Sequence, residues 1–369
     1  MSGFPQTYWR KLASGRLTGL ADRLVLILLS PLGWLYALGQ QLRALMYQGG
    51  ILKTFRLPRP VISIGNITVG GTGKTPVTAR IAKDLLARGY KVAVLSRGYG
   101  GSMEGRACVV SDGKSIMLKA VECGDEPYLL ASTVTGLIVV IGSDRYAAGQ
   151  LAMQFTPDIF LLDDGFQHLR LHRDLNILLL DYSRPFGNRM VLPAGLLRES
   201  IPAMQRADLI LFTRAPQKGA AVNIDTHGIP YCISSHTIAD LVQLDTGKVL
   251  PISSCKGKKI MTFAGIADPD LFFEGLRGLG LNLVDCISYS DHEAYDEKRA
   301  DQLLDAMRTS AAELIVTTEK DGVKIKGLSQ VLTGQILLAR LDLTIDNPVN
   351  LNNKLAVLLP SVVRFDNCS

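Results

Sequence analysis

The residues of this chain that are best suited to chemistry begin with a glycine-rich stretch, VGGTGKT, at residues 69–75. It follows a short apolar run and precedes a segment with helical periodicity, which is the context of a phosphate-binding Walker A motif. Glycines let backbone N–H groups close around phosphate oxygens, and the N-terminus of the following helix favours negative charge. The usual first glycine is replaced here by Thr68. The expected phosphate-binding residues are Gly70, Gly71, Thr72, Gly73, Lys74 and Thr75.

The same pattern predicts ATP and Mg²⁺ as cofactors. Lys74 would reach the β- and γ-phosphates, and the Thr75 hydroxyl would ligate Mg²⁺. A P-loop enzyme also needs a carboxylate at the end of a neighbouring strand, and the run DIFLLDD at residues 158–164 supplies Asp163 and Asp164. One of the two should hold Mg²⁺ through a water or position the nucleophile. The pattern does not say which one does so.

Short apolar runs alternating with helical stretches must position these residues. The runs are rich in Ile, Val and Leu and nearly continuous in apolar character, which is typical of parallel strands buried on both faces. They occupy residues 60–65, 91–96, 136–142, 158–164, 176–181, 208–213, 259–265 and 313–318. The expected fold class is therefore α/β and P-loop NTPase-like, with a mostly parallel sheet flanked by helices. Asp112-Gly113, between two alternating runs, indicates a hairpin.

The chain divides into four expected parts. Residues 1–50 are expected to form a membrane-associated helical segment, and residues 51–225 are expected to form the P-loop domain. Residues 226–257 are polar and irregular and are expected to be a linker, with a hairpin at 245–247. A new β-α-β series opens the last part, residues 258–369, which is expected to be a smaller α/β domain.

The N-terminal part carries the chain's positive charge. The whole chain has a net charge of +6, yet residues 1–60 alone hold eight basic residues and one acidic residue. Between Arg23 and Arg43 lies an uncharged run, residues 24–42, which as a helix would extend roughly 28 Å, close to the ~30 Å hydrocarbon core. No small-residue cleavage site follows it, so a signal peptide fits poorly. We expect contact with an anionic membrane surface, by spanning or by lying flat.

Six cysteines are far apart and form no Cys-x-x-Cys pair, which argues against a structural zinc site and a disulfide framework. With 47% hydrophobic and 20% charged residues, the composition is that of a globular protein. His172, His227 and His236 are interpreted as ordinary solvated or capping residues.

Several longer motifs are more specific than the phosphate loop. In chain order they read GNITVGGTGKTP, LSRGYGG, GDEP, SDR, DDGFQHLRLHRDLNILLLD, LPAGLLRE and, far downstream, TTEKD. From about residue 20 to about residue 325 the chain resembles the tetraacyldisaccharide 4′-kinase family, the lipid A kinases of Gram-negative bacteria. The resemblance implies that ATP phosphorylates the 4′-hydroxyl of a tetraacylated glucosamine disaccharide 1-phosphate, giving lipid IVA, on the cytoplasmic face of the inner membrane. It also implies a β-ribbon linker between the P-loop kinase domain and the smaller C-terminal domain, which closes the active-site cleft between them.

The resemblance further implies roles for individual residues. Asp125 and Glu126 of GDEP match a catalytic acidic pair, and His292 of Ser290-Asp291-His292 matches a histidine that pairs with Asp125. An imidazole oriented in this way could accept the proton of the sugar hydroxyl. The implied substrate-binding or supporting residues are Tyr99, Glu126, Arg145, Gln167, His168, Arg198 and Glu199.

Two other functions stay open on the residues alone. One is a soluble small-molecule kinase or ligase, against which the basic, apolar N-terminus argues. The other is a P-loop nucleotide switch, although the chain has no Asn-Lys-x-Asp run for guanine. The cationic excess lies beside an apolar run and lacks a pattern of stacking aromatics, so no nucleic-acid partner is expected. No obligate protein partner is inferred.

Overall fold

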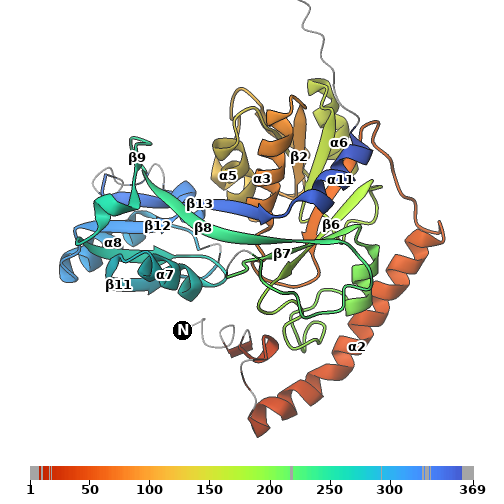
Figure 1. The fold of residues 1–369 in the computed structure, drawn as a ribbon, viewed down its shortest axis with the longest axis horizontal. Helices are drawn as coiled ribbons and strands as arrows, with labels where there is room; N and C mark the ends of the chain where they lie inside the picture. Colours follow the sequence, from red (N-terminus) through yellow and green to blue (C-terminus); the bar gives the residue numbers. More distant parts are fainter. Residues whose placement is uncertain are drawn as a thin grey trace, which may run out of the picture.

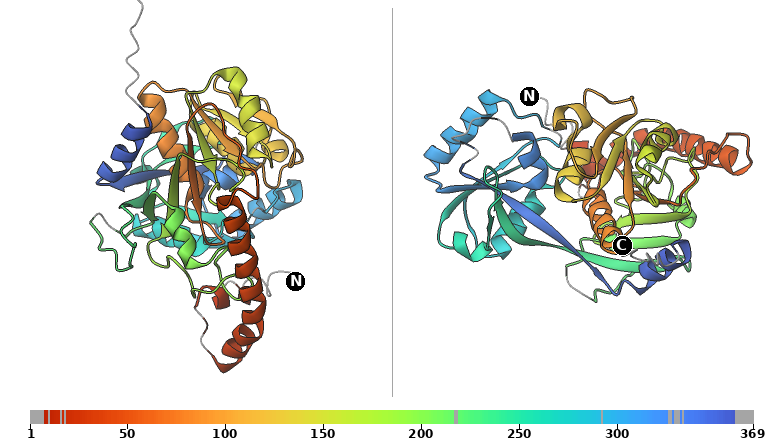
Figure 2. Two further views of the ribbon diagram at one scale, coloured as in Figure 1. Left: turned by 90° about the vertical axis from the view of Figure 1, so that its right-hand side faces the viewer. Right: turned by 90° about the horizontal axis from the view of Figure 1, so that it is seen from above.

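The computed structural model describes residues 8–359, apart from residues 10, 16, 18, 217–218, 292, 326–327, 329–331 and 333. Its centre is one continuous twisted sheet of 13 strands, in the order β11-β10-β12-β13-β8-β7-β6-β1-β5-β2-β4-β3, with β9 paired to β8. Figures 1 and 2 show that the sheet runs through two lobes joined by a two-stranded ribbon. The predicted α/β class with a mostly parallel sheet is confirmed.

The P-loop lobe contains the larger part of the sheet. Its strands are β1 (Val61–Asn66), β2 (Val92–Ser96), β3 (Cys108–Asp112), β4 (Ile138–Ile141), β5 (Ile159–Asp163), β6 (Leu175–Asp181) and β7 (Leu209–Thr213). Its helices are α3 (Lys74–Ala87), α4 (Ala120–Cys123), α5 (Asp125–Thr133) and α6 (Arg145–Ala152). Each of the six apolar runs predicted as strands in this lobe forms one, and only β3 pairs antiparallel.

Alternation along the central strands explains why the runs are apolar throughout. Leu161 of β5 enters the core beneath α3, whereas its neighbours Phe160 and Leu162 enter the core on the opposite face, which α6 covers. All three are fully buried. The sheet therefore carries a hydrophobic layer on both faces, as parallel sheets require.

The C-terminal lobe is a smaller sheet flanked by helices. It contains β10 (Lys259–Ala264), β11 (Asn282–Ser288) and β12 (Leu314–Thr318), with helices α7 (Pro269–Gly278), α8 (Glu297–Thr309) and α9 (Glu319–Ile325). The strands are parallel to one another. The predicted β-α-β series after residue 258 is present.

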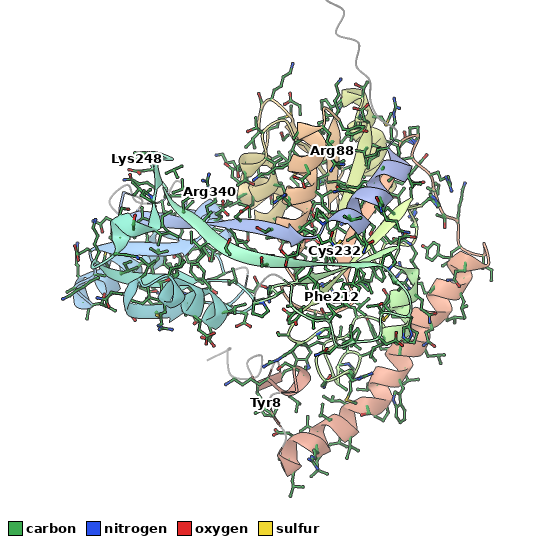
Figure 3. All side chains as sticks on the ribbon, in the orientation of Figure 1. Tyr8, Arg88, Phe212, Cys232, Lys248 and Arg340 are labelled. Carbon is green, nitrogen blue, oxygen red and sulfur yellow. The ribbon has the colours of Figure 1, made fainter. Side chains whose placement is uncertain are left out.

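The ribbon consists of β8 (Tyr231–Gln243) and β13 (Ile336–Asp346), which pair antiparallel over most of their length. Strand β9 (Val249–Leu250) closes the predicted hairpin at 245–247 against β8. In Figure 3, Lys248 and Arg340 mark the part of the ribbon toward the C-terminal lobe, and Cys232 marks the P-loop lobe end. Through β13 the chain returns to the P-loop lobe, where α11 (Val349–Leu358) packs Leu351 and Leu355 into the core beneath α3. The end of the expected 258–369 part thus belongs to the other lobe.

Helix α2 (Leu20–Gln48) extends beyond the body of the P-loop lobe (Figures 1 and 2). It continues through Pro31 without a break. One side rests on the lobe, where Gly33 is buried and lies against Val191. Most of its other large side chains are exposed, including Leu28 at 76% and Trp34 at 72%. Within the described residues it is the one helix whose length and hydropathy suit a membrane span, and only 6% of that apolar window is buried.

Candidate active site

The phosphate loop stands between the end of β1 and the start of α3, as the sequence predicts. Gly73 precedes α3 with φ of 77° and Gly70 has φ of 118°, conformations that favour glycine. The buried Asn66 side chain donates to the Thr72 hydroxyl at 2.8 Å, and the Thr213 hydroxyl donates to the Thr72 carbonyl at 2.9 Å. These hydrogen bonds from the carboxyl ends of β1 and β7 therefore fix the conformation of the loop.

Asp163 and Asp164 lie at the end of β5 beside this loop, in two different settings. Asp163 is 2% exposed and accepts a hydrogen bond from Thr78 of α3 at 3.0 Å. Asp164 accepts two hydrogen bonds from Arg198, at 3.1 and 2.9 Å, and its carboxylate lies 3.7 Å from the Lys74 ammonium. Lys74 thus already faces a carboxylate at the place where phosphates would bind.

The carboxyl groups of Asp163 and Asp164 differ in pKa because their surroundings differ. Burial raises the pKa of Asp163 to about 7, and the nearby charges of Glu126 and Asp164 add to the shift. Burial acts in the same direction on Asp164, but Lys74 and Arg198 outweigh it and hold the pKa of Asp164 below its ordinary value. Asp164 is therefore the permanent anion of the pair, and Asp163 takes up a proton readily when no cation is near.

The segment LPAGLLRE, residues 192–199, lies directly against the phosphate loop. The Val69 amide donates to the Leu196 carbonyl at 2.7 Å, and the Arg198 amide donates to the Ile67 carbonyl at 2.7 Å. Glu199 turns inward, 5% exposed, and pairs with Arg206 at 2.7 Å. Gln167 donates to the Glu199 carboxylate at 3.0 Å, so Glu199 and Gln167 brace the segment that presents Arg198.

Arg145, which is buried, and His168, which is half-buried, form a polar layer behind the acidic pair. Arg145 is 4% exposed and donates to the Gly142 carbonyl, and the charges of Asp163 and Asp164 counteract the lowering of its pKa by burial. Burial and the charges of Arg145 and Arg173 lower the pKa of His168 to about 4. His168 is therefore neutral at pH 7, and its Nε2 atom has no hydrogen-bond partner within the described part of the chain.

The GDEP segment forms the start of α5 at the boundary with the C-terminal lobe. Asp125 and Glu126 occupy the first turn of this helix, where its dipole favours carboxylates. The RGYG loop packs closely on it, since a Cβ on Gly124 would lie 2.6 Å from the Tyr99 carbonyl oxygen. The Tyr99 side chain is 58% exposed.

Two lysines of α9 face this pair from the C-terminal lobe. Lys324 lies 3.6 Å from Asp125, and Lys320 lies 3.3 Å from Glu126 and 3.3 Å from Asp291. The lobes therefore meet at the GDEP carboxylates. His292 lies outside the described residues, so its pairing with Asp125 stays a prediction.

The ribbon and the end of β7 cover the phosphate loop from a third side. A Cβ on Gly73 would lie 2.7 Å from Cε1 of His236, and Arg214 donates to the Gly71 carbonyl. Burial lowers the pKa of His236 to about 4. His236 is thus not the solvated or capping residue that the sequence suggests: it is a neutral, half-buried imidazole packed on the loop. His227 is indeed half-exposed beside Asp225, and His172 pairs with Asp174.

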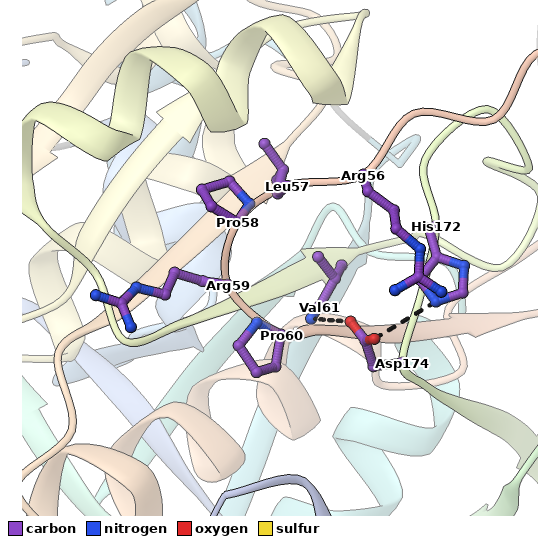
Figure 4. A pocket seen from close by; sticks show the side chains of 8 residues that line it. All are labelled: Arg56, Leu57, Pro58, Arg59, Pro60, Val61, His172 and Asp174. Carbon is purple, nitrogen blue, oxygen red and sulfur yellow. Dashed lines mark hydrogen bonds and ion pairs between the residues drawn. The ribbon is translucent and has the colours of Figure 1, made fainter.

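A small surface pocket with a volume of about 180 Å³ lies far from these residues, toward the other end of the strands. It lies at the amino end of β1, where Asp174 accepts from the Val61 amide at 2.8 Å and lies 3.4 Å from His172 (Figure 4). The phosphate loop follows the carboxyl end of β1, which is the edge where α/β proteins bind ligands. The pocket in Figure 4 is therefore not part of the candidate active site.

The sequence did not predict the residues that reach the site from the C-terminal lobe, from the ribbon and from the end of β7. Lys320, Lys324, Arg214 and His236 received no role, although Lys320 belongs to the quoted motif TTEKD. A signal was present for Lys320 alone, because a charged motif after a buried apolar run marks the carboxyl end of a strand.

Comparison with known proteins gives a consistent answer. The family model for tetraacyldisaccharide-1-P 4′-kinase (LpxK) matches residues 25–359. A tetraacyldisaccharide 4′-kinase from Pelobacter propionicus is 56% identical over 354 residues, covering 96% of this chain and 98% of that protein. One from Geobacter metallireducens is 51% identical over 331 residues, covering 89% and 97%.

Among solved structures, the crystal structure of LpxK from Aquifex aeolicus in complex with ATP superposes with a TM-score of 0.74 at 32% identity. The match covers 89% of this chain and 97% of that one. The match in fold extends through both lobes, and the family model spans the motifs that surround the phosphate loop. This chain belongs to the tetraacyldisaccharide-1-phosphate 4′-kinase family.

Proposed function

We propose that the chain transfers the γ-phosphoryl group of ATP to the 4′-hydroxyl of a tetraacylated glucosamine disaccharide 1-phosphate, giving the bis-phosphorylated lipid A precursor. One observation carries the assignment of a lipid acceptor: the segment 191–200 touches both the phosphate loop and α2. Arg198 binds Asp164 beside Lys74, while Gly33 of α2 lies against Val191 and Gln41 donates to Ser200 at 3.3 Å. A lipid whose acyl chains lie along α2 would bring its sugar head to the phosphates.

The nucleotide half of the reaction belongs to the P-loop lobe. Backbone amides of residues 70–75 bind the phosphates of ATP, and Lys74 leaves Asp164 to bind the β- and γ-phosphates. Arg145 and Arg198 stabilise the charge that develops on the transferred group. Such preorganised cations are most effective in a partly dehydrated site.

The residues present fit a Mg²⁺ ion. Within the described residues, no group of three or more His, Cys, Asp or Glu could hold a metal by itself. Mg²⁺ suits such a site, because it usually takes one or two protein ligands and completes its shell with water and substrate phosphate oxygens. Thr75 and Asp163 would hold it, with Asp164 alongside, and the raised pKa of Asp163 is what a cation site shows without its cation. When bound, the ion would neutralise the charge of the β- and γ-phosphates.

The acceptor half belongs to the boundary between the lobes. In the proposed step the 4′-oxygen bonds to the γ-phosphorus, the bond to the bridging oxygen breaks, and ADP leaves. His292, oriented by Asp125, accepts the hydroxyl proton. The position of Asp125 in the first turn of α5, at the lobe boundary, supports this role.

Helix α2 supports a site on the cytoplasmic face of the inner membrane. Its exposed leucines would enter the acyl region, and the basic residues that flank it would face anionic head groups. ATP is cytoplasmic, and no step of the reaction requires the lobes to cross the bilayer.

The test is turnover with purified protein in detergent, ATP, Mg²⁺ and the tetraacylated disaccharide 1-phosphate. Mass spectrometry should show the lipid gaining one phosphate with stoichiometric ADP, and Lys74→Ala should remove the product. ATP hydrolysis without lipid phosphorylation would instead favour a nucleotide switch.

A further inference from the structure

Lys320 and Lys324 lie four positions apart on α9, so both project from one face of this helix toward α5. α5 belongs to the P-loop lobe and α9 to the C-terminal lobe, and contacts between these two helices join the lobes. Each lysine reaches a different one of the two neighbouring carboxylates in GDEP: Lys324 at 3.6 Å from Asp125 and Lys320 at 3.3 Å from Glu126.

Lys320 also binds a carboxylate of its own lobe. Its ammonium donates to Glu126 and to Asp291, each at 3.3 Å, and its side chain is 17% exposed. Asp291 immediately precedes His292 in the chain. Burial by itself would lower the pKa of Lys320, but Glu126 and Asp291 outweigh it and raise the pKa above its ordinary value. Lys320 is therefore charged and held by carboxylates from both lobes.

Lys324 is anchored differently. It lies 3.5 Å from Asp321, which is fully buried. Asp321 accepts hydrogen bonds from the Gly265 amide at 3.0 Å, the Tyr295 hydroxyl at 3.1 Å and the Thr318 hydroxyl at 2.7 Å. This network binds the start of α9 to the core of its own lobe. The network thus fixes the position of the helix from which Lys320 contacts Glu126.

We propose that Lys320 is a positioning residue for phosphoryl transfer, which docks the segment at Asp291 onto the start of α5, where Asp125 lies. The proposal rests on the proposed function, because it assigns a task to a residue that would not touch ATP or the sugar. Without Lys320, Glu126 and Asp291 would lose the cation that joins them, and the segment at Asp291 would be held less firmly against α5. A displacement of about 1 Å in a catalytic group can cost a hundredfold in rate.

The test compares Lys320→Met with Lys320→Arg and with a matched control, Lys298→Met, which replaces an exposed lysine of α8 in the same lobe. We expect Lys320→Met to lower kcat for the lipid by roughly ten- to a hundredfold, whereas the Kd for ATP changes less than about threefold. Lys320→Arg, which can bridge both carboxylates, should recover most of kcat. Lys298→Met should behave as wild type.

Hydrogen exchange of the full-length protein without substrate supplies an independent readout. In Lys320→Met the backbone amides of residues 286–291 should exchange faster than in wild type, while those of β1 and α3 stay unchanged. Glu126→Gln removes one end of the bridge while conserving the shape of the side chain. It should give the same local increase in amide exchange, which would show that the effect in Lys320→Met does not come from misfolding.

The outcomes separate the two proposals. If wild type forms no phosphorylated lipid, the proposed function fails, but the exchange data still report on the docking. An ATP Kd that rises together with the loss of kcat would mean that Lys320 binds phosphate directly, and would overturn the positioning role. Unchanged exchange and unchanged kcat in Lys320→Met would also overturn it.

Discussion

Lys74 and Lys320 both face carboxylates at the candidate active site, but they do so in opposite ways. Lys74 lies 3.7 Å from Asp164 within one lobe, in a loop whose sequence alone predicts its task. Lys320 joins Glu126 to Asp291 across the boundary between lobes. Its sequence neighbours do not predict this contact, and only the motif TTEKD draws attention to the residue. The site for the nucleotide phosphates is formed by residues that are close together in the sequence. A site for the acceptor is encoded by contacts that only the folded chain makes.

The difference predicts separable functions. Residues of the first kind should govern ATP binding and chemistry together, whereas residues of the second kind should govern chemistry with little effect on ATP.

Lys74→Ala should lower kcat by roughly a thousandfold or more, because no other side chain in the phosphate loop brings a positive charge to the phosphates. Its affinity for ATP should fall as well. The measurement is steady-state turnover with the lipid acceptor, alongside ATP binding by calorimetry. Lys83→Ala, at an exposed position of the same helix, is the control and should keep wild-type values. A Lys74→Ala protein with near-normal turnover would refute the phosphate-loop assignment.

Replacing Leu24, Leu28 and Leu35 of α2 with Gln should release the protein from vesicles that contain anionic lipid. These side chains are 62%, 76% and 67% exposed, and burying each in the membrane contributes roughly 1.5–3 kcal/mol. Turnover on dispersed lipid should fall with vesicle binding, while the Kd for ATP stays unchanged. The measurement is vesicle co-sedimentation at low and high salt.

The control for that experiment is a triple Gln variant at Leu271, Val349 and Val357, which are exposed apolar residues away from α2. If this control leaves the vesicles as readily as the α2 variant does, α2 is not the anchor. Loss of wild-type binding at high salt would indicate a helix that lies at the surface, whereas retention would indicate a spanning one.

Asp163→Asn should change how stability depends on pH. The folded pKa of Asp163 is about 7, above the value of about 4 for an unfolded carboxyl group. Between these values the folded state binds a proton that the unfolded state does not, so this group lowers the free energy of unfolding as pH rises. Relative to wild type, the variant should therefore gain stability progressively from about pH 4 to about pH 7.

Urea unfolding at a series of pH values, with EDTA present, measures the effect. His168 and His236, whose pKa values are lowered to about 4, act in the opposite direction but are common to both proteins and cancel. Asp305→Asn, at a side chain that is 75% exposed, is the control. A stability difference that stays constant across this pH range would show that Asp163 is ionised throughout.

Most of the fold could be predicted because the strands are buried on both faces. The runs that became β1, β2, β4, β5, β6, β7, β10 and β12 are almost uninterrupted in apolar character. The family resemblance implied a ribbon, but the hydrophobic pattern did not locate its strands, because each is partly exposed. His236 of β8 packs on the phosphate loop, while Tyr231 of the same strand is 40% exposed. β11 lies at the edge of the sheet and mixes apolar with charged residues, so its pattern is weak.

The candidate site divides in the same way. Lys74, Asp163 and Asp164 follow from a loop and a strand end that are recognisable locally. The partners that decide their state come from elsewhere: Arg198 from a segment after β6 and Thr78 from α3. No periodicity links residue 320 to residue 126, because the contact exists only where two helices from different lobes meet.

The most direct test of the proposed acceptor site is a double-mutant cycle at Asp125 and His292, which are proposed to act as one catalytic unit. Asp125→Ala, His292→Ala and the double variant should each lose kcat by a similar factor, on the order of 10²–10⁴. The Kd for ATP should stay close to the wild-type value in all three. Losses that multiply in the double variant, or a Kd for ATP that rises with them, would contradict an acceptor site built between the lobes.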